Sequence, residues 1–180
     1  LDAEGRKNLD LLGSRVKRMQ NRIEGGLEYS RVGRIREDME MVDFNSLVKE
    51  VIDSLSPPEH IRISIDANLP VIRFEKTRAR QIFANLIGNA IKYMDKPEGE
   101  IHIGCTSSGD SWTFYVGDNG PGIEARYYEK IFQIFQTLHP RDQVESTGIG
   151  LTIVKKIVEM YHGRIWVESN VSMGSIFYFT

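Results

Sequence analysis

The hydrophobic and polar positions of this chain change their period several times, which indicates that helices and strands alternate along it. The first such pattern has hydrophobic residues at alternating spacings of three and four, as in one seam of a coiled coil. Its members are Leu9, Leu12, Val16, Met19 and Ile23. The pattern predicts a long coiled-coil-type helix within residues 1–35, weakened near its end by Gly25 and Gly26. One helix cannot bury its own seam, so we expect partner helices, in a self-dimer or in a bundle.

Residues 36–180 mix shorter helices with strands. A charged linker over 31–41 is expected first, then a helix over 44–55 that Asp43 caps and Pro57 and Pro58 end. The remaining expected elements are strands at 61–65 and 71–74, a helix over 76–94, a hairpin of strands around 101–105 and 112–116 with its turn at 107–110, a short helix over 125–135, a helix over 150–161 and a closing hairpin of 165–167 with 176–179. Adjacent hairpins together with helices predict an α+β fold, a two-layer sandwich in which helices cover a mixed sheet.

Composition narrows the class of protein. The 180 residues are 41% hydrophobic and 27% charged, with a net charge of −2, so no basic footprint for nucleic acid is present. No hydrophobic run is long enough for a membrane span, so we expect no membrane contact. The single cysteine, Cys105, excludes an internal disulfide and is compatible with the reducing cytoplasm. The chain opens without Met in the middle of a pattern, which suggests a fragment of a longer protein.

The predicted helix over 76–94 has a polar face that is unusual for a core helix. Asn85, Asn89, Lys92 and Tyr93 fall on one side, and the hydrophobic residues fall on another. Two amide oxygens suit a hard cation such as magnesium, a lysine one turn away can meet a phosphate, and a tyrosine ring can lie against a base. Taken alone, the pattern fits an ordinary solvated face equally well.

A second motif directly follows the predicted strand that ends at Val116: Asp118-Asn119-Gly120-Pro121-Gly122-Ile123. A carboxylate followed by glycines lets a flat ligand approach the backbone closely. An ionised aspartate only accepts hydrogen bonds. It would therefore accept one from the exocyclic amine of adenine and disfavour guanine, which has an acceptor there. On its own, this sequence favours an ordinary turn over a binding site.

A third motif, Thr147-Gly148-Ile149-Gly150-Leu151, opens the last long helix. Glycines at a helix N-terminus expose unpaired amides and the positive end of the helix dipole to an anion. The motif lacks the Gly-Lys-Ser/Thr of a phosphate loop, and a lone Gly-x-Gly is weak support for such a site. In isolation, a flexible hinge into a helix explains it equally well.

Together, these motifs resemble the N, G1, F and G2 boxes of sensor histidine kinases, with Phe132 and Phe135 as the F box. That family belongs to the ATPase superfamily of gyrase, the mismatch-repair protein MutL and a heat-shock chaperone, with its Bergerat-type ATP-binding fold. The resemblance covers nearly the whole chain, and residues 135–142 are similar to phytochrome-type members. Residues 1–35 resemble part of the second helix of the dimerisation and phosphotransfer hairpin, and residues 36–180 resemble the ATP-binding domain.

The resemblance implies a role for each motif residue. Asn89 would coordinate Mg²⁺ with Asn85 beside it, Lys92 would contact the phosphates, and Tyr93 would lie near the adenine or ribose. Asp118 would bind the adenine amine. The remaining implied ATP-binding residues are Gly120, Gly122 and Ile123 in the pocket wall, Phe132 and Phe135 at the base of a mobile lid over 137–147, and Thr147, Gly148, Ile149, Gly150 and Leu151 at the phosphates.

The resemblance further implies a histidine kinase that dimerises through its hairpin and transfers the γ-phosphoryl group of ATP to a histidine and then to a response regulator. None of the four histidines has the family's acceptor context, so the acceptor is expected upstream. Many relatives carry an arginine where this chain has Thr137. Arg141 could substitute; otherwise transition-state stabilisation is weakened. An ATP-hydrolysing clamp is the first alternative, although clamps carry a glutamate where this chain has Asn85. A non-catalytic nucleotide-binding scaffold is the second, supported by Thr137 alone.

Overall fold

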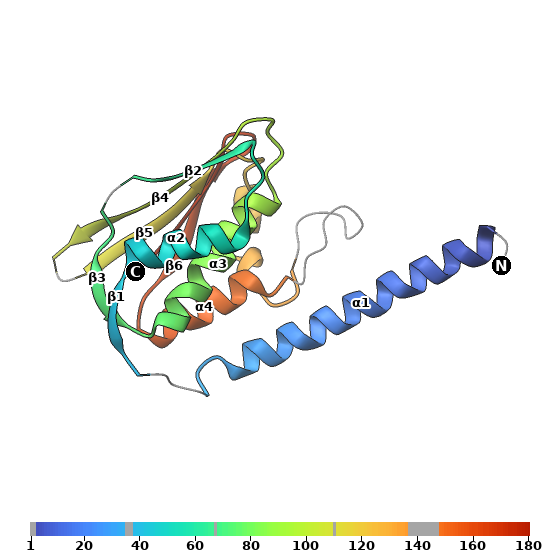
Figure 1. Ribbon diagram of the computed structural model, residues 1–180, viewed down its shortest axis with the longest axis horizontal. Helices are drawn as coiled ribbons and strands as arrows, with labels where there is room; N and C mark the ends of the chain where they lie inside the picture. The colour runs from blue at the N-terminus through green and yellow to red at the C-terminus, as the bar shows by residue number, and fades with distance from the viewer. Residues whose placement is uncertain (1–2, 35–37, 67, 110, 137–147) are drawn as a thin grey trace.

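Helix α1 (Ala3–Arg31) is one continuous helix of 29 residues that runs past the rest of the molecule and extends well beyond it (Figure 1). The computed structural model describes residues 3–34, 38–66, 68–109, 111–136 and 148–180. The helix continues through Gly25 and Gly26 to Arg31. The five seam residues remain 53–64% exposed, so nothing in the described chain covers them. The long helix is therefore confirmed, and its seam is unpartnered among the described residues.

A five-stranded sheet forms the centre of the remaining chain, in the order β2-β4-β5-β7-β6. Its strands are β2 (Ile61–Ile65), β4 (Gly99–Ser108), β5 (Ser111–Asp118), β6 (Ile165–Asn170) and β7 (Gly174–Phe179). Strands β2 and β4 are parallel and the other pairs are antiparallel, so the sheet is mixed. Helices α2 (Phe44–Leu55), α3 (Lys76–Lys92) and α4 (Gly150–Met160) cover one face (Figure 1). The predicted α+β fold is confirmed.

Aromatic rings join the helices to the sheet in the core. Phe44 of α2 and Phe179 of β7 each stack with Phe114 of β5, with ring centroids 5.0 and 5.2 Å from that ring. Phe83 of α3 meets Phe179 edge to face at 5.5 Å. Such pairs stabilise the core beyond the area that they bury. Because α3 turns Phe83 and its other hydrophobic residues into this core, its polar residues lie on a different side of the helix.

The capping signals read from the sequence act as expected. Asp43 is the N-cap of α2, and its carboxylate accepts hydrogen bonds from the Asn45 amide at 2.9 Å and the Ser46 hydroxyl at 2.8 Å. These bonds, with Ser46 contributing most, lower the pKa of Asp43. Ser56 closes the helix in the left-handed region, directly before Pro57. The predicted bounds of α2 are therefore confirmed, together with their cause.

Three expectations differ from the structure. The predicted linker over 31–41 already contains the start of β1 (Glu40–Asp43), which pairs antiparallel with β3 (Val71–Phe74). The short helix expected over 125–135 is instead two 3-10 turns, η1 (Ala125–Tyr127) and η2 (Lys130–Phe132). Strand β5 continues to Asp118, so this residue ends the strand rather than following it.

The expected lid over 137–147, with Thr137, Arg141 and Thr147, lies outside the described residues, as does Asp110. No described helix is long and apolar enough to cross a membrane.

Candidate functional site

A cavity of about 460 Å³ lies where α3, α4, the end of β5 and the C-terminal part of α1 meet. It brings together residues of all three motifs. The predicted residues that line it are Asn85, Asn89, Lys92, Tyr93, Asp118, Gly122, Ile123, Gly148, Ile149, Gly150 and Leu151. Gly120 is buried but does not line the cavity, Phe135 is 40% exposed outside it, and Phe132 packs edge to face on Phe177. Segments distant in sequence therefore form one site.

Asp118 supplies a carboxylate at the end of the cavity beside Tyr93, since an added Cβ at Gly120 would lie 2.8 Å from the Asp118 Oδ1 and 3.8 Å from the Tyr93 carbonyl oxygen. Its Oδ1 accepts a hydrogen bond of 2.8 Å from the Gly120 amide, and the Ser175 amide also donates to this side chain. Burial raises the pKa of Asp118, and these two bonds offset only part of that effect. Gly122 has a φ of +73°, and an added Cβ there would lie 2.1 Å from the Asn170 carbonyl oxygen. Only glycine fits at position 122, because the loop after Asp118 packs directly against the Asn170 backbone.

Asn85 and Asn89 line the cavity from earlier turns of α3, and Asn85 marks its other end, about 12 Å along the helix from Tyr93. The Asn85 Nδ2 donates to the Gln81 carbonyl at 2.8 Å, which directs its Oδ1 away from its own helix. An added Cβ at Gly150 would lie 2.6 Å from that Oδ1, so α3 and the start of α4 are in close contact. Hard amide oxygens at this place fit Mg²⁺, which keeps several water or phosphate ligands. The described residues contain no cluster of three or more His, Cys, Asp or Glu side chains that would form a protein-only metal cage.

The N-terminus of α4 opens onto the same end of the cavity. Ile149 occupies the N-cap position, and no side chain of the described residues caps the helix there. Gly148 has a φ of +66°, and its carbonyl accepts from the Phe135 amide at 2.9 Å. The first amides of α4 and the helix dipole are therefore available to an anion.

Helix α1 contributes a wall that the sequence did not predict: Asn21, Glu24, Gly25 and Glu28 line the cavity. Three contacts hold the helix in place. The Gln81 Nε2 donates to Glu28 Oε1 at 2.7 Å, the Lys156 Nζ donates to the Tyr29 carbonyl at 2.7 Å, and Gly25 packs on Ile149. In the sequence, the only sign that α1 packs closely on another segment is the glycine at position 25 within a helical pattern. Two carboxylates beside this end of the cavity favour a ligand that carries a cation.

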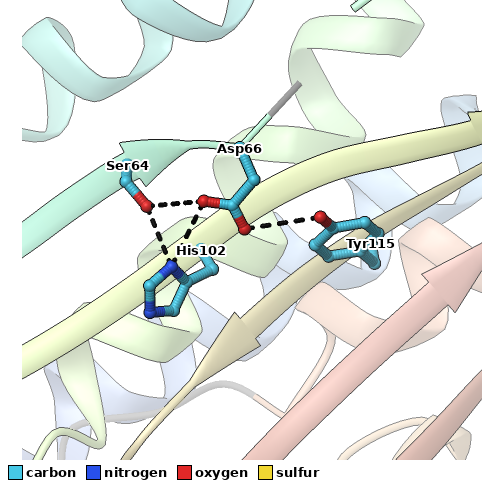
Figure 2. Close-up of polar contacts among 4 residues, drawn as sticks. All are labelled: Ser64, Asp66, His102 and Tyr115. Carbon is cyan, nitrogen blue, oxygen red and sulfur yellow. Dashed lines mark hydrogen bonds and ion pairs between the residues drawn. The ribbon is translucent and has the colours of Figure 1, made fainter. Parts of the chain in front are cut away.

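A polar cluster lies on the open face of the sheet, opposite the helices (Figure 2). Tyr115 alternates with the core residues Phe114 and Val116, and the cluster's His102 side chain is 51% exposed. The Ser64 Oγ lies 2.9 Å from both Asp66 Oδ1 and His102 Nδ1, and Tyr115 donates to Asp66 Oδ2 at 3.3 Å. Ser64 and Asp66 both contact the same ring nitrogen, whereas a Ser-His-Asp triad uses one nitrogen for each partner. This cluster therefore lacks the geometry of a nucleophilic triad.

Comparison with known proteins places the chain in an ATPase family. Residues 74–180 match the family described as histidine kinase-, DNA gyrase B-, and HSP90-like ATPase. The chain is 42% identical over 185 residues to cyanobacterial phytochrome B of Nostoc sp. strain PCC 7120, covering the whole chain and 25% of that protein. It thus spans about a quarter of the length of the curated relatives that it matches first.

Solved structures give the same result. Full-length ShkA in complex with AMPPNP matches with a TM-score of 0.76 and 26% identity, over 99% of this chain and 39% of that one. Histidine kinase ThkA in complex with response regulator protein TrrA matches with a TM-score of 0.70 and 28% identity, over 99% of this chain and 52% of that one. The chain therefore belongs to the histidine kinase-, DNA gyrase B- and HSP90-like ATPase family and carries a catalytic domain of the sensor histidine kinase type.

Proposed function

We propose that this chain binds ATP together with Mg²⁺ in the cavity and is the catalytic part of a sensor histidine kinase. The observation that carries the proposal is the convergence of Asp118, the Asn85–Asn89 face and the N-terminus of α4 on one cavity. A carboxylate at one end and anion-binding groups at the other match the two ends of ATP. The match of ShkA, solved in complex with AMPPNP, supports the same ligand class.

Adenine would bind at the Asp118 end. Its exocyclic amine donates to the carboxylate, and guanine would place a carbonyl oxygen against the same negative charge. The burial of Asp118 strengthens the preference for adenine over guanine, because an unpaired hydrogen-bond acceptor is costly away from water. Ile123 and Tyr93, which line this cavity, supply flat or hydrophobic surface for the base and ribose.

The triphosphate would extend toward Asn85, Asn89 and the start of α4. Lys92 and the amides after Gly148 offset the phosphate charge, while Asn89, with Asn85 beside it, would hold the magnesium through amide oxygens. Bound magnesium neutralises charge on the transferring group, which leaves positioning as the main task of the protein. Glu24 and Glu28 beside this end would oppose a triphosphate that lacks a cation.

The phosphoryl acceptor would be a histidine outside this chain. Helix α1 contains no histidine, His60 follows two prolines, His102 lies on β4 at the open face of the sheet, and His162 follows α4. We propose that residues 1–35 belong to a helical hairpin that dimerises and carries the acceptor on its other helix, and that residues 36–180 are the catalytic domain. A response regulator would then receive the phosphoryl group, in line with the matched complex of ThkA and TrrA.

The competing activity is ATP hydrolysis, as in the clamp proteins of this superfamily. Clamps need a carboxylate that activates water, and the corresponding residue here is Asn85, whose Nδ2 already donates to the Gln81 carbonyl. An amide cannot accept the proton. We therefore expect this chain to bind ATP without sustained release of phosphate.

Calorimetry with ATP and GTP, each with and without Mg²⁺, tests the proposal directly. We expect binding of Mg-ATP, at least tenfold weaker binding of GTP and little phosphate release over hours. Incubation with γ-labelled ATP should leave this chain unlabelled. Acid-labile, base-stable label on the chain alone would place a phosphohistidine here and contradict the assignment of the acceptor. Sustained phosphate release would favour the clamp, and an absence of ATP binding would overturn the proposal.

A further inference from the structure

The loop that carries Gly122 and Ile123 rests on the β6–β7 hairpin through one side chain. The Ile123 amide donates to the Ser169 Oγ at 2.8 Å, although the two residues are 46 positions apart. The Ser172 amide also donates to the Pro121 carbonyl at 2.6 Å. Ser169 does not line the cavity, but Ile123 does. Ser169 therefore acts on the cavity through residues that it contacts rather than by lining it.

The hydroxyl of Ser169 uses its full hydrogen-bonding capacity. It donates to the Gly174 carbonyl at 2.7 Å, so its two lone pairs remain for the Ile123 amide and for the Ser175 hydroxyl at 2.9 Å. A hydroxyl has one donor and two acceptor positions, and all three are occupied here. Ser175 also lines the cavity. One hydroxyl thus fixes two points of the cavity wall.

Tyr128 holds Ser169 from the other side. Its hydroxyl donates to the Ser169 carbonyl at 2.5 Å and accepts from the Ser169 amide at 3.1 Å. Strand β6 is at the edge of the sheet, where alternate residues direct both backbone groups outward without a strand partner. The phenol replaces the missing strand at that one residue. It therefore fixes the backbone from which the Ser169 hydroxyl projects.

We infer that Ser169 is a positioning residue for the adenine end of the cavity and that Tyr128 holds Ser169 in place. This inference rests on the proposed binding of ATP. The hydrogen bonds of Ser169 set the position of the Ile123 wall and of Ser175 relative to Asp118. Loss of the Ser169 hydroxyl frees the Ile123 amide and lets the loop move away from the hairpin.

Calorimetry of the 180-residue chain with Mg-ATP and Mg-ADP tests this with four variants. We expect Ser169→Ala to weaken both nucleotides by the same factor, roughly five- to tenfold, because only the adenine end is disturbed. Ser169→Thr keeps the hydroxyl and should restore most of the affinity. Tyr128→Phe keeps the ring and the Ser169 hydroxyl but loses both phenol bonds, so roughly threefold weaker binding is expected. Tyr178→Phe removes a phenol whose ring stacks on Trp166, away from the cavity, and should bind as the unmodified chain does.

An NMR spectrum of the backbone amides supplies a second measurement, which does not depend on the overall stability of the protein. The Ile123 amide proton should shift upfield in Ser169→Ala and return in Ser169→Thr, because it tracks the bond to the hydroxyl. Unchanged affinity in both Ser169→Ala and Tyr128→Phe would overturn the inference, as would an unchanged Ile123 resonance. Should Ser169→Ala fail to fold, Tyr128→Phe alone decides, and wild-type affinity there would overturn it. Failure of the unmodified chain to bind ATP would instead overturn the proposed function and remove the basis of this inference.

Discussion

Gly25 of helix α1 lies directly against Ile149, the residue between the two glycines at the start of α4. A Cβ added at Gly25 would lie 2.3 Å from the Ile149 Cδ1, and Ile149 itself is only 1% exposed. The long helix is therefore docked on the segment that lines the end of the cavity proposed to bind the phosphates. Movement of α1 and the shape of this end of the cavity are consequently coupled through one close contact.

Replacing Gly25 with Leu should displace α1 from the catalytic domain, because the added side chain has no space beside Ile149. Gly26→Leu is the matched control, since nothing lies within 4 Å of an added Cβ at Gly26. Both changes raise helix propensity by roughly 1 kcal/mol, so propensity cancels in the comparison. Small-angle scattering should show a larger radius of gyration for Gly25→Leu only. Equal radii would mean that Ile149 yields and that α1 stays docked.

Replacing Asp118 with Asn should weaken ATP binding by roughly 1–3 kcal/mol through loss of a charge-assisted hydrogen bond. The pH dependence supplies a sharper test. Burial raises the pKa of Asp118 above its ordinary value of 3.8, and the protonated form loses the charged acceptor. ATP affinity should therefore begin to fall at a higher pH than an ordinary carboxyl would allow.

Calorimetry at pH 7 and at lower pH, on both proteins, checks this expectation. Titration of ATP itself affects both proteins alike, so the steeper acid loss should belong to the unmodified chain alone. Parallel pH profiles would show that Asp118 does not meet the base.

The fold was predictable from sequence wherever local chemistry determines it. The cap at Asp43, the alternation in β4 and the polar face at Asn85 and Asn89 each depend on neighbours a few positions away. Strand β1 was missed because its pairing with β3 depends on a segment about thirty residues distant. The segment after Ala125 forms 3-10 turns because it packs as a short connection beside α4 rather than as a helix with its own hydrophobic stripe.

The candidate site was predictable only for residues with characteristic chemistry in a characteristic order. Gly25 was interpreted as a weak point of a helix, whereas the structure uses its small size for a close approach to Ile149. Glu28 looks like an ordinary surface residue until α1 is placed beside α3. Ser169 carries no sequence signal, because a serine in a strand becomes informative only when its partners from the loop after β5 are known.

The Asp66 cluster on the open face should contribute to stability rather than to nucleotide binding. Burial alone would raise the pKa of Asp66, but hydrogen bonds from Ser64, His102 and Tyr115, with the charge of His102, outweigh it and lower that pKa. A lowered pKa means that the ionised form stabilises the folded state above pH 3.8, and that this contribution is lost as the pH falls through the folded value.

Asp66→Asn should therefore lower the unfolding temperature at pH 7, and the difference from the unmodified chain should shrink below pH 3.8. Glu100→Gln, an exposed change on the same strand as His102, is the control. Thermal unfolding at pH 7 and pH 3 measures the effect. ATP affinity at pH 7 should not change, because the cluster is on the face opposite the cavity; a clear change in affinity would contradict this assignment.

The exposed seam of α1 should hold two copies of the chain together, as the proposed dimer requires. Val16 is 63% exposed in the seam, and it lies nine residues before Gly25, which is about 180° around the helix at 100° per residue. The seam and the surface that contacts the catalytic domain are therefore on opposite sides of α1.

Val16→Asp should abolish dimerisation, because it places a charge where hydrophobic residues meet. Ser14→Asp adds the same charge about 160° away from Val16 and is the control. Sedimentation over a range of concentrations should give a dimer for the unmodified chain and for Ser14→Asp, and a monomer for Val16→Asp with unchanged ATP affinity. Dimers that persist in Val16→Asp would assign self-association to another surface, and an unmodified chain that stays monomeric would show that this seam alone does not support a dimer.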